Sequence, residues 1–396
     1  MSELTYVNGS CHCGLNTFRV GFVTSSLPLS TNLCHCSICR HTSGQLAFEH
    51  APISGSPISR SSAPATEDNP SIPLGLAGMT GYQSSSNVTR YFCKACSAHL
   101  FRAVSNTEAD GDKKWAVAAG ALETTDGILK VSRHTWVSDT LDGGIADHLR
   151  QIKGVGELPR YKEGVGSPEV PLGWNIVDVK QGGVPLLKAF CHCRALRFAI
   201  SRPTDKSVLS AKEASTYPDL MYAYISTEPS KIQNPNGDPW WLTPHNSGTK
   251  TKYLAGHCTC TTCRLTSGSE VQSWTFVPLL NILVPSPTAP PEADEWVPLC
   301  LLKDEERPKG LTQYNSSPGK FRESCSTCGA TGFWWRKGVP NLIDFSVGLL
   351  DESIAGTRAV DWLDWWTGRV SFEEEALSHE IASGLEEGLK EYASKA

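Results

Sequence analysis

The sequence predicts a mainly β protein made of two tandem repeats, each organised around seven cysteines. A C-x-C-x-x-C cluster occurs twice, at residues 34–39 and 258–263, and both copies continue through Arg into a Thr-Ser-Gly segment. Each copy lies between an upstream C-x-C pair and a downstream C-x-x-C pair, and residues 82–96 align with residues 314–328 without a gap, which indicates an internal repeat. Short stretches that alternate apolar and polar residues outnumber helical patterns, so strands should predominate.

The number and spacing of the thiols predict two kinds of metal site in each repeat. A structural zinc ion has four ligands in a tetrahedron, whereas a catalytic zinc ion has three protein ligands and an open position. A C-x-C pair and a C-x-x-C pair together supply four thiolates, which leaves the C-x-C-x-x-C cluster for a second, open site. The four-cysteine sets are Cys11, Cys13, Cys93 and Cys96, and Cys191, Cys193, Cys325 and Cys328; the three-cysteine sets are Cys34, Cys36 and Cys39, and Cys258, Cys260 and Cys263.

Disulfide bonds are the alternative use of the 15 cysteines. Disulfide-dense chains are typically small and extracellular. This N-terminus lacks the basic region and apolar core of a signal peptide, and the thiols are clustered as metal ligands usually are. We therefore expect metal sites and a cytoplasmic location.

The composition of the chain limits the kinds of partner that it can bind. A net charge of -5 gives no support for a nucleic-acid surface or an acidic membrane, and no window holds 18 successive apolar residues. At 396 residues with 40% hydrophobic residues, the chain is long enough for two domains. We expect a first domain at 1–155, a linker at 156–183, and a second domain at 184–396 with insertions at 205–253 and 284–310. Tandem duplication also suggests that the repeats pack as an intramolecular pseudo-dimer.

One helix is expected at the C-terminus. Ser371 with Glu374 forms a capping-box pattern that would begin it. Its apolar stripe, at a spacing of four, consists of Leu377, Ile381, Leu385 and Leu389.

The motifs at residues 9–14, 34–44 and 90–96 resemble the glutathione-dependent formaldehyde-activating enzyme family, whose domain is shared with centromere protein V. The resemblance extends over both repeats. It implies a β-tent fold, in which small antiparallel sheets meet around a four-cysteine zinc ion, with a second zinc ion on each C-x-C-x-x-C cluster. Carried onto this chain, it gives up to four zinc ions bound by the fourteen clustered cysteines.

The resemblance also implies carbon-sulfur lyase chemistry on a small-molecule thiol or its adduct, with glutathione as co-substrate adding to formaldehyde or released from the S-hydroxymethyl adduct. An open zinc site would hold the thiol as a thiolate. The catalytic group would be Cys34, Cys36 and Cys39 with His35 and Arg40, because the first repeat is nearer the family pattern. Arg40 and Arg264 are candidates to bind a carboxylate of glutathione, or else simply compensate the thiolate charge; His35 is a candidate base or a hydrogen-bond donor to a ligand.

Two other functions remain open at the level of sequence. The same fold could serve a glutathione-assisted isomerase, dehalogenase or detoxifying lyase on a larger substrate, with Trp240, Trp241, Trp334 and Trp335 either shaping a wide pocket or filling the core. Alternatively, a histidine such as His41, His50 or His134 could close the second zinc site, which would leave a non-catalytic, zinc-stabilised binding protein.

Overall fold

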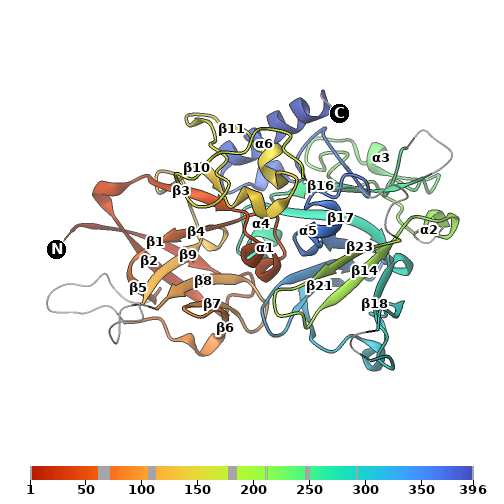
Figure 1. Cartoon of the computed structure of the whole chain (residues 1–396), viewed down its shortest axis with the longest axis horizontal. Helices are drawn as coiled ribbons and strands as arrows, with labels where there is room; N and C mark the ends of the chain where they lie inside the picture. Colours follow the sequence, from red (N-terminus) through yellow and green to blue (C-terminus); the bar gives the residue numbers. More distant parts are fainter. Residues whose placement is uncertain are drawn as a thin grey trace.

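The chain folds mainly into β-strands arranged in several small sheets, as the sequence predicts (Figure 1). The computed structural model describes residues 2–60, 72–105, 113–176, 185–209, 211, 213–245, 250–290 and 293–394. Within these residues, none of the helices has the length and apolar character that a membrane crossing requires.

The N-terminal part forms a three-stranded and a seven-stranded sheet. The three-stranded sheet has the order β1 (Leu4–Ser10), β2 (Thr17–Val23), β5 (Ser54–Ser59). The seven-stranded sheet has the order β10 (Leu129–Thr135), β3 (Leu29–Cys34), β4 (Phe48–Pro52), β9 (Lys114–Ala118), β8 (His99–Val104), β7 (Val88–Cys93), β6 (Met79–Ser85). In β2, Phe18 and Val20 are buried while Thr17 is exposed and Arg19 half-buried, so the alternation in the sequence produces a strand with one face in the core.

The C-terminal part repeats this plan on a larger scale. A four-stranded sheet has the order β13 (Leu186–Phe190), β14 (Arg197–Ser201), β18 (Ile282–Pro285), β19 (Trp296–Pro298). An eight-stranded sheet has the order β15 (Leu242–Thr243), β16 (Lys252–Cys258), β17 (Gln272–Pro278), β23 (Val339–Ser346), β22 (Thr331–Arg336), β21 (Lys320–Cys325), β20 (Leu311–Ser317), with β24 (Leu363–Trp365) beside β16. A separate pair joins β11 (Gln151–Ile152) and β12 (Gly156–Glu157).

The two largest sheets share one strand pattern. In the first, β10 pairs with β3 in parallel, and β3, β4, β9, β8, β7 and β6 follow in antiparallel order. In the second, β24 pairs with β16 in parallel, and β16, β17, β23, β22, β21 and β20 follow in antiparallel order.

Two short helices lie between these sheets, where Figure 1 shows them at the centre of the molecule. Helix α1 (Ser37–Ser43) packs against the 3-10 turn η8 (Val347–Leu349), and α4 (Thr261–Ser267) packs against η3 (Ala119–Ala121). The backbones touch directly: the Gly120 amide donates to the Gly268 carbonyl at 3.1 Å, and a Cβ on Gly348 would lie 2.4 Å from the Gly44 carbonyl oxygen. Only glycine permits this approach.

The C-terminal helix begins later than the sequence predicts. Helix α6 spans His379–Ala393, and its N-cap is Ser378, whose hydroxyl accepts a hydrogen bond from the amide of Ile381 at 3.3 Å. The capping box predicted at Ser371 and Glu374 is wrong, because Glu373–Glu375 forms a separate 3-10 turn, η9, and the chain is extended at Ala376 and Ser378. The other short helices are α2 (Asp205–Leu209), α3 (Pro229–Ile232) and α5 (Glu352–Ala355).

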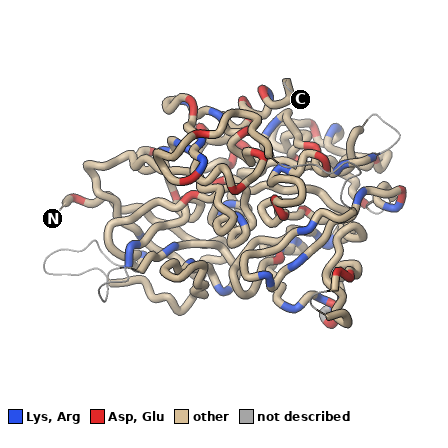
Figure 2. The backbone as a smooth tube through the Cα atoms, viewed as in Figure 1, with Lys and Arg blue, Asp and Glu red and all other residues tan. Residues whose placement is uncertain are grey.

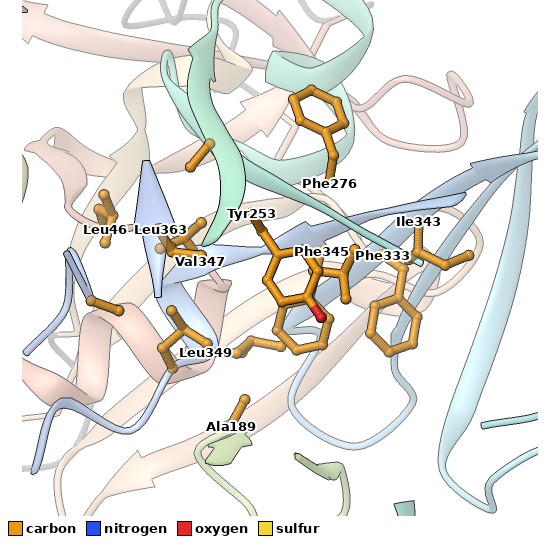
Figure 3. Packing of buried hydrophobic residues seen from close by; sticks show 14 of the residues in the cluster. Leu46, Ala189, Tyr253, Phe276, Phe333, Ile343, Phe345, Val347, Leu349 and Leu363 are labelled. Atoms are coloured by element: carbon orange, nitrogen blue, oxygen red, sulfur yellow. The ribbon is translucent and has the colours of Figure 1, made fainter. Parts of the chain in front are cut away.

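The largest hydrophobic cluster includes residues from both parts of the chain. Leu46 and Leu149 pack in the same cluster as Val347 and Leu363, and Figure 3 shows Leu46 beside Leu363. Residues 156–176, within the expected linker, also pack on the body, since Arg160 forms an ion pair with Asp147. Figure 2 shows Lys and Arg interspersed with Asp and Glu along the backbone.

Candidate metal centres

The structure brings the clustered cysteines together in the four groups that their spacing predicts. In each group the sulfur atoms all lie within 4.8 Å of one another. The groups are Cys11, Cys13, Cys93 and Cys96; Cys191, Cys193, Cys325 and Cys328; Cys34, Cys36 and Cys39; and Cys258, Cys260 and Cys263. All fifteen cysteines are free, so the disulfide alternative is not what the chain adopts.

The four-cysteine groups fit a tetrahedral metal ion. Zinc-sulfur bonds of about 2.3 Å place neighbouring sulfurs about 3.8 Å apart. The Cys11 sulfur lies 3.5 Å from that of Cys13 and 3.6 Å from that of Cys93. Backbone amides point at the sulfurs as they do at thiolates, with Asn16 donating to Cys11 at 3.4 Å and Leu196 to Cys191 at 3.3 Å.

The thiols of a four-cysteine group also influence one another's ionisation. Hydrogen bonding with Cys93 lowers the pKa of Cys11 to about 4, whereas hydrogen bonding with Cys11 raises the pKa of Cys96 far above its ordinary value. Sulfurs this close cannot all ionise, because each thiolate disfavours the next. A divalent cation among them removes the conflict, so this donor set suits zinc.

The three-cysteine groups are built by a strand end and a helix start. Cys34 ends β3, Cys36 is the N-cap of α1, and the Cys36 sulfur accepts a hydrogen bond from the amide of Cys39 at 3.3 Å. In the second group Cys260 caps α4 and accepts from the amide of Cys263 at 3.3 Å. The N-terminus of a helix favours thiolates.

Each three-cysteine group has a buried arginine that the sequence did not single out for this role. Arg90 Nη2 donates to the Cys39 sulfur at 3.2 Å, and Arg322 Nη2 donates to the Cys263 sulfur at 3.3 Å. The pKa values of both thiols fall well below their ordinary value, first because of hydrogen bonds within each cluster and then because of these arginines. The available signal was that both arginines precede a C-x-x-C pair by three positions in the internal repeat.

The arginines that the sequence proposed for substrate binding have partners inside the protein. Arg40 has no exposed surface, and its Nη2 lies 3.0 Å from Glu352 Oε2. Arg264 Nη1 donates to the carbonyls of Gly120 and Leu122 at 2.7 and 2.9 Å. Both side chains therefore tie a short helix to the opposite part of the chain, and neither is free to bind a carboxylate from solvent.

The histidines near the first group are also engaged elsewhere. His35 Nε2 lies 2.9 Å from His134 Nδ1, and His134 Nε2 lies 2.8 Å from the Leu149 carbonyl oxygen. His41 bonds the Phe190 carbonyl at 2.8 Å and Glu352 at 3.0 Å, and the ring of His50 packs on Phe48. No histidine, aspartate or glutamate of the described chain completes either three-cysteine group within the 4.8 Å limit.

A cavity of about 380 Å³ lies over the second three-cysteine group. Its wall includes Cys258, Cys260 and Cys263, and part of it comes from the predicted insertion at 205–253, including Tyr217, Leu220 and Trp240. One tryptophan of each predicted pair lines it, Trp240 and Trp334. Trp334 and Trp335 are adjacent in β22, so their side chains point to opposite faces of the sheet. The other two are in the core: Trp241 Nε1 donates to the Ser207 carbonyl and Trp335 Nε1 to Glu323.

The cavity wall also carries a carboxyl group beside the sulfurs. Burial, together with the nearby Cys263 sulfur, raises the pKa of Asp344 to about 8. In the seven-stranded sheet, Ala116 occupies the position that Asp344 has in the eight-stranded sheet. Pro52 of β4 pairs with Ala116 of β9, just as Phe276 of β17 pairs with Asp344 of β23. Each three-cysteine group therefore has the same arrangement of cysteines and one arginine that contacts a sulfur, but the residues around the two groups differ.

Fold and site together define a mainly β protein with cysteine clusters of the kind that bind zinc. Residues 6–139 match the family model described as glutathione-dependent formaldehyde-activating enzyme, a span that contains the first seven clustered cysteines. A curated protein of Halomonas elongata, whose name assigns it provisionally to the same activity, is 53% identical over 38 residues, which is 10% of this chain and 22% of that protein. The chain thus spans about a fifth of the length of this curated relative. No solved structure matches the chain.

Proposed function

We propose that the chain is a zinc-dependent enzyme of carbon-sulfur lyase type that acts on a thiol adduct, such as a glutathione adduct, at a three-cysteine centre. One observation carries this proposal: three sulfurs within 4.8 Å of one another, with no fourth ligand among the described residues, line a cavity. The match of residues 6–139 to the formaldehyde-activating family supports thiol chemistry over water activation.

We assign the substrate to the second centre, although the sequence favoured the first. What supports this choice is the cavity of about 380 Å³ over Cys258, Cys260 and Cys263. The four-cysteine clusters would then hold structural zinc, for up to four ions per chain. We also propose that residues 1–155 and 184–396 are tandem copies that pack as a pseudo-dimer, which the shared strand order of the two largest sheets supports.

A zinc ion held by Cys258, Cys260 and Cys263 would supply a site that binds a thiol as its thiolate. The chain itself contributes charge and shape. Three thiolates around a divalent ion leave a net charge of about -1, and the buried Arg322 offsets it through its contact with Cys263. Trp274, which packs on Cys258 and Cys263, limits the access of water to the sulfurs.

The lining of the cavity also favours a second candidate, an enzyme of the same fold acting on a larger, partly apolar molecule. Glutathione alone could fill a site of this volume, but Trp240, Trp274 and Trp334 in the wall suit an apolar group that formaldehyde does not have. A glutathione-assisted isomerase, dehalogenase or detoxifying lyase would use this space. Activity with formaldehyde and glutathione alone would remove this candidate.

The experiment compares Cys260→Ser with the matched variant Cys36→Ser. Turnover of formaldehyde plus glutathione and of a panel of S-adducts should fall about 100-fold or more in the first variant and stay near the wild-type value in the second. In parallel, added thiol should change the visible spectrum of cobalt-substituted protein. If turnover falls in Cys36→Ser and not in Cys260→Ser, the substrate binds at the first centre instead. If no added thiol changes the spectrum, the site is closed and non-catalytic.

A further inference from the structure

Two cations face each other at the edge of the cavity. Lys320 of β21 pairs with Arg336 of β22 across the antiparallel register, and both line the cavity. Lys320 is exposed and Arg336 is half-buried. Within the described residues, neither has a carboxylate within 4.0 Å. Like charges directly opposite each other on paired strands repel, so an anionic group bound between them would be favoured.

The other charged groups of the cavity wall do not neutralise this pair. Arg322 donates to the Cys263 sulfur. Asp219 binds Arg369 and accepts hydrogen bonds from Ser371 and the amide of Phe372. Glu375 accepts from the amide of Thr261 at 2.8 Å, at the start of α4. Asp344 also lines the wall, but burial raises its pKa to about 8 although the charge of Arg336 acts to lower it, and no ion pair within 4.0 Å joins Asp344 to either cation.

The cavity wall also contains several aromatic side chains. Trp240 and Phe276 pack edge to face with their ring centroids 5.0 Å apart, and Trp274 and Trp334 lie in one hydrophobic cluster with the cysteines. Aromatic walls of this kind bind flat or bulky apolar groups. The cavity therefore offers sulfur ligands at one part, an aromatic wall, and two cations at its edge.

The first centre lacks the tryptophan Trp334 and the pair of cations Lys320 and Arg336 at the matching positions. Arg90 in β7 and Arg322 in β21 both contact a sulfur, so we take them as equivalent positions when comparing the two pairs of strands. Arg90 pairs with Arg102 where Arg322 pairs with Trp334, and Val88 pairs with Val104 where Lys320 pairs with Arg336. The cation pair thus belongs to the second centre alone, so the shared cysteine and arginine framework does not require it.

We propose that the second centre selects thiols or thiol adducts that carry both an aromatic group and a carboxylate, with Lys320 and Arg336 binding the carboxylate. This inference rests on the proposed function, because the sulfur of the ligand would go to the same cluster. It goes beyond that function because it specifies the chemical groups that the ligand must carry besides its sulfur. The aromatic wall orients the ligand between the cations and the sulfurs.

Calorimetric titration of the purified, metal-containing full chain tests this. The probes are 4-mercaptobenzoate, thiophenol and glutathione, which separate an aromatic acid, an aromatic group alone and a non-aromatic acid. We expect 4-mercaptobenzoate to bind at least about tenfold more tightly than either other thiol, as two charge-assisted contacts would give. In the double variant K320V/R336V, which copies the valine pair of the first centre, this preference over thiophenol should vanish while thiophenol affinity stays the same.

Lys337→Val is the matched control, because Lys337 follows Arg336 but is exposed and lies outside the cavity lining. Its titration should equal that of the wild type, and metal content by mass spectrometry should be unchanged in all variants. The single variant Arg336→Gln, expected to lose part of the preference, replaces the double variant if that one does not fold. Equal binding of 4-mercaptobenzoate and thiophenol, or an unchanged preference in K320V/R336V, overturns this inference alone; an absence of binding by every thiol overturns the proposed function together with it.

Discussion

The Nδ1 atom of His12 lies 2.8 Å from the hydroxyl oxygen of Tyr314. His12 stands between the two cysteines of the first C-x-C pair, and Tyr314 is in β20 of the eight-stranded sheet. The same contact occurs in reverse, because His192 Nδ1 lies 2.6 Å from the hydroxyl of Tyr82 in β6. Each four-cysteine cluster is therefore fastened to the sheet that holds the other one.

Removing this hydroxyl should loosen the contact between the two parts of the chain. We expect Tyr314→Phe to lower the free energy of unfolding by about 1 kcal/mol, the usual net value of one hydrogen bond. Tyr82→Phe should have a similar effect. Urea unfolding of the metal-containing protein measures both, and Tyr6→Phe, a half-buried tyrosine of β1, is the control. If the three variants unfold alike, the two contacts do not stabilise the fold.

Arg90 and Arg322 should control how tightly each three-cysteine centre holds metal. Each donates to one sulfur of its own centre and offsets the negative charge of the thiolates. We expect Arg322→Gln to weaken metal binding at the second centre about 10 to 100-fold, the usual effect of losing a partner that supports a metal ligand. Arg90→Gln should do the same at the first centre only.

A competition titration with a coloured zinc chelator measures this effect, and each variant is the other's control. One metal ion of the four should become weaker in either variant, and the double variant should show two. A uniform weakening of all sites in a single variant would mean that the arginine acts through overall stability instead.

The cysteine groups could be predicted from the sequence because their spacing is local. A C-x-C or C-x-x-C pair brings its two sulfurs to one side of a turn wherever the turn lies in the fold. The mainly β class followed from alternating strands for the same reason. For the cavity, the two tryptophan pairs were the only local signal, and they fitted a buried core equally well, because the wall combines an insertion with strands that are distant in the sequence.

The roles of the arginines show where local reasoning ends. Cys36 is the N-cap of α1 and Cys39 lies in its first turn, so the capping hydrogen bond from the Cys39 amide keeps the two sulfurs together. Arg40 is one position further on, and this step turns it about 100° around the helix axis, toward Glu352. Arg90, which does contact a sulfur, comes from a strand 51 residues away from Cys39, and only the folded sheet brings the two together.

Metal should leave the two kinds of cluster at different rates. The four-cysteine groups would enclose a metal ion completely, whereas the three-cysteine groups would leave one side of it open. We expect four zinc ions per chain, two of which a chelator removes first with little loss of structure. Removal of the remaining two should unfold the surrounding strands, because structural zinc contributes directly to folding.

The measurement is metal content by mass spectrometry beside circular dichroism at each chelator concentration. Cys11→Ser removes a ligand from a four-cysteine site and should lower thermal stability. Cys260→Ser removes a ligand from a three-cysteine site and should lower the metal content by one ion, with a smaller loss of thermal stability. Two ions in the purified protein instead of four would mean that the three-cysteine centres do not retain metal.

Stability should fall as the pH rises through neutrality because of two buried glutamates. Glu49 of β4 and Glu270, just after α4, line one small internal cavity between the two largest sheets. Burial raises the pKa of Glu49 to about 7, and burial followed by the charge of Glu49 raises the pKa of Glu270 to about 8. Because both values lie above those of the unfolded chain, the stabilising effect is complete below about pH 4.5 and is lost as the pH passes 7 to 8.

Unfolding by urea at pH 6.5 and pH 9 tests this, in a range where the thiolate clusters keep their metal. We expect the wild type to lose about 1 to 3 kcal/mol more than the double variant Glu49→Gln/Glu270→Gln, which keeps the shape of the pair without its ionisation. Glu157→Gln, at an exposed position of β12, serves as the control and should follow the wild type. A double variant with the same pH dependence as the wild type would show that both carboxyl groups are already ionised in the folded protein at pH 6.5, so that burial does not raise their pKa values.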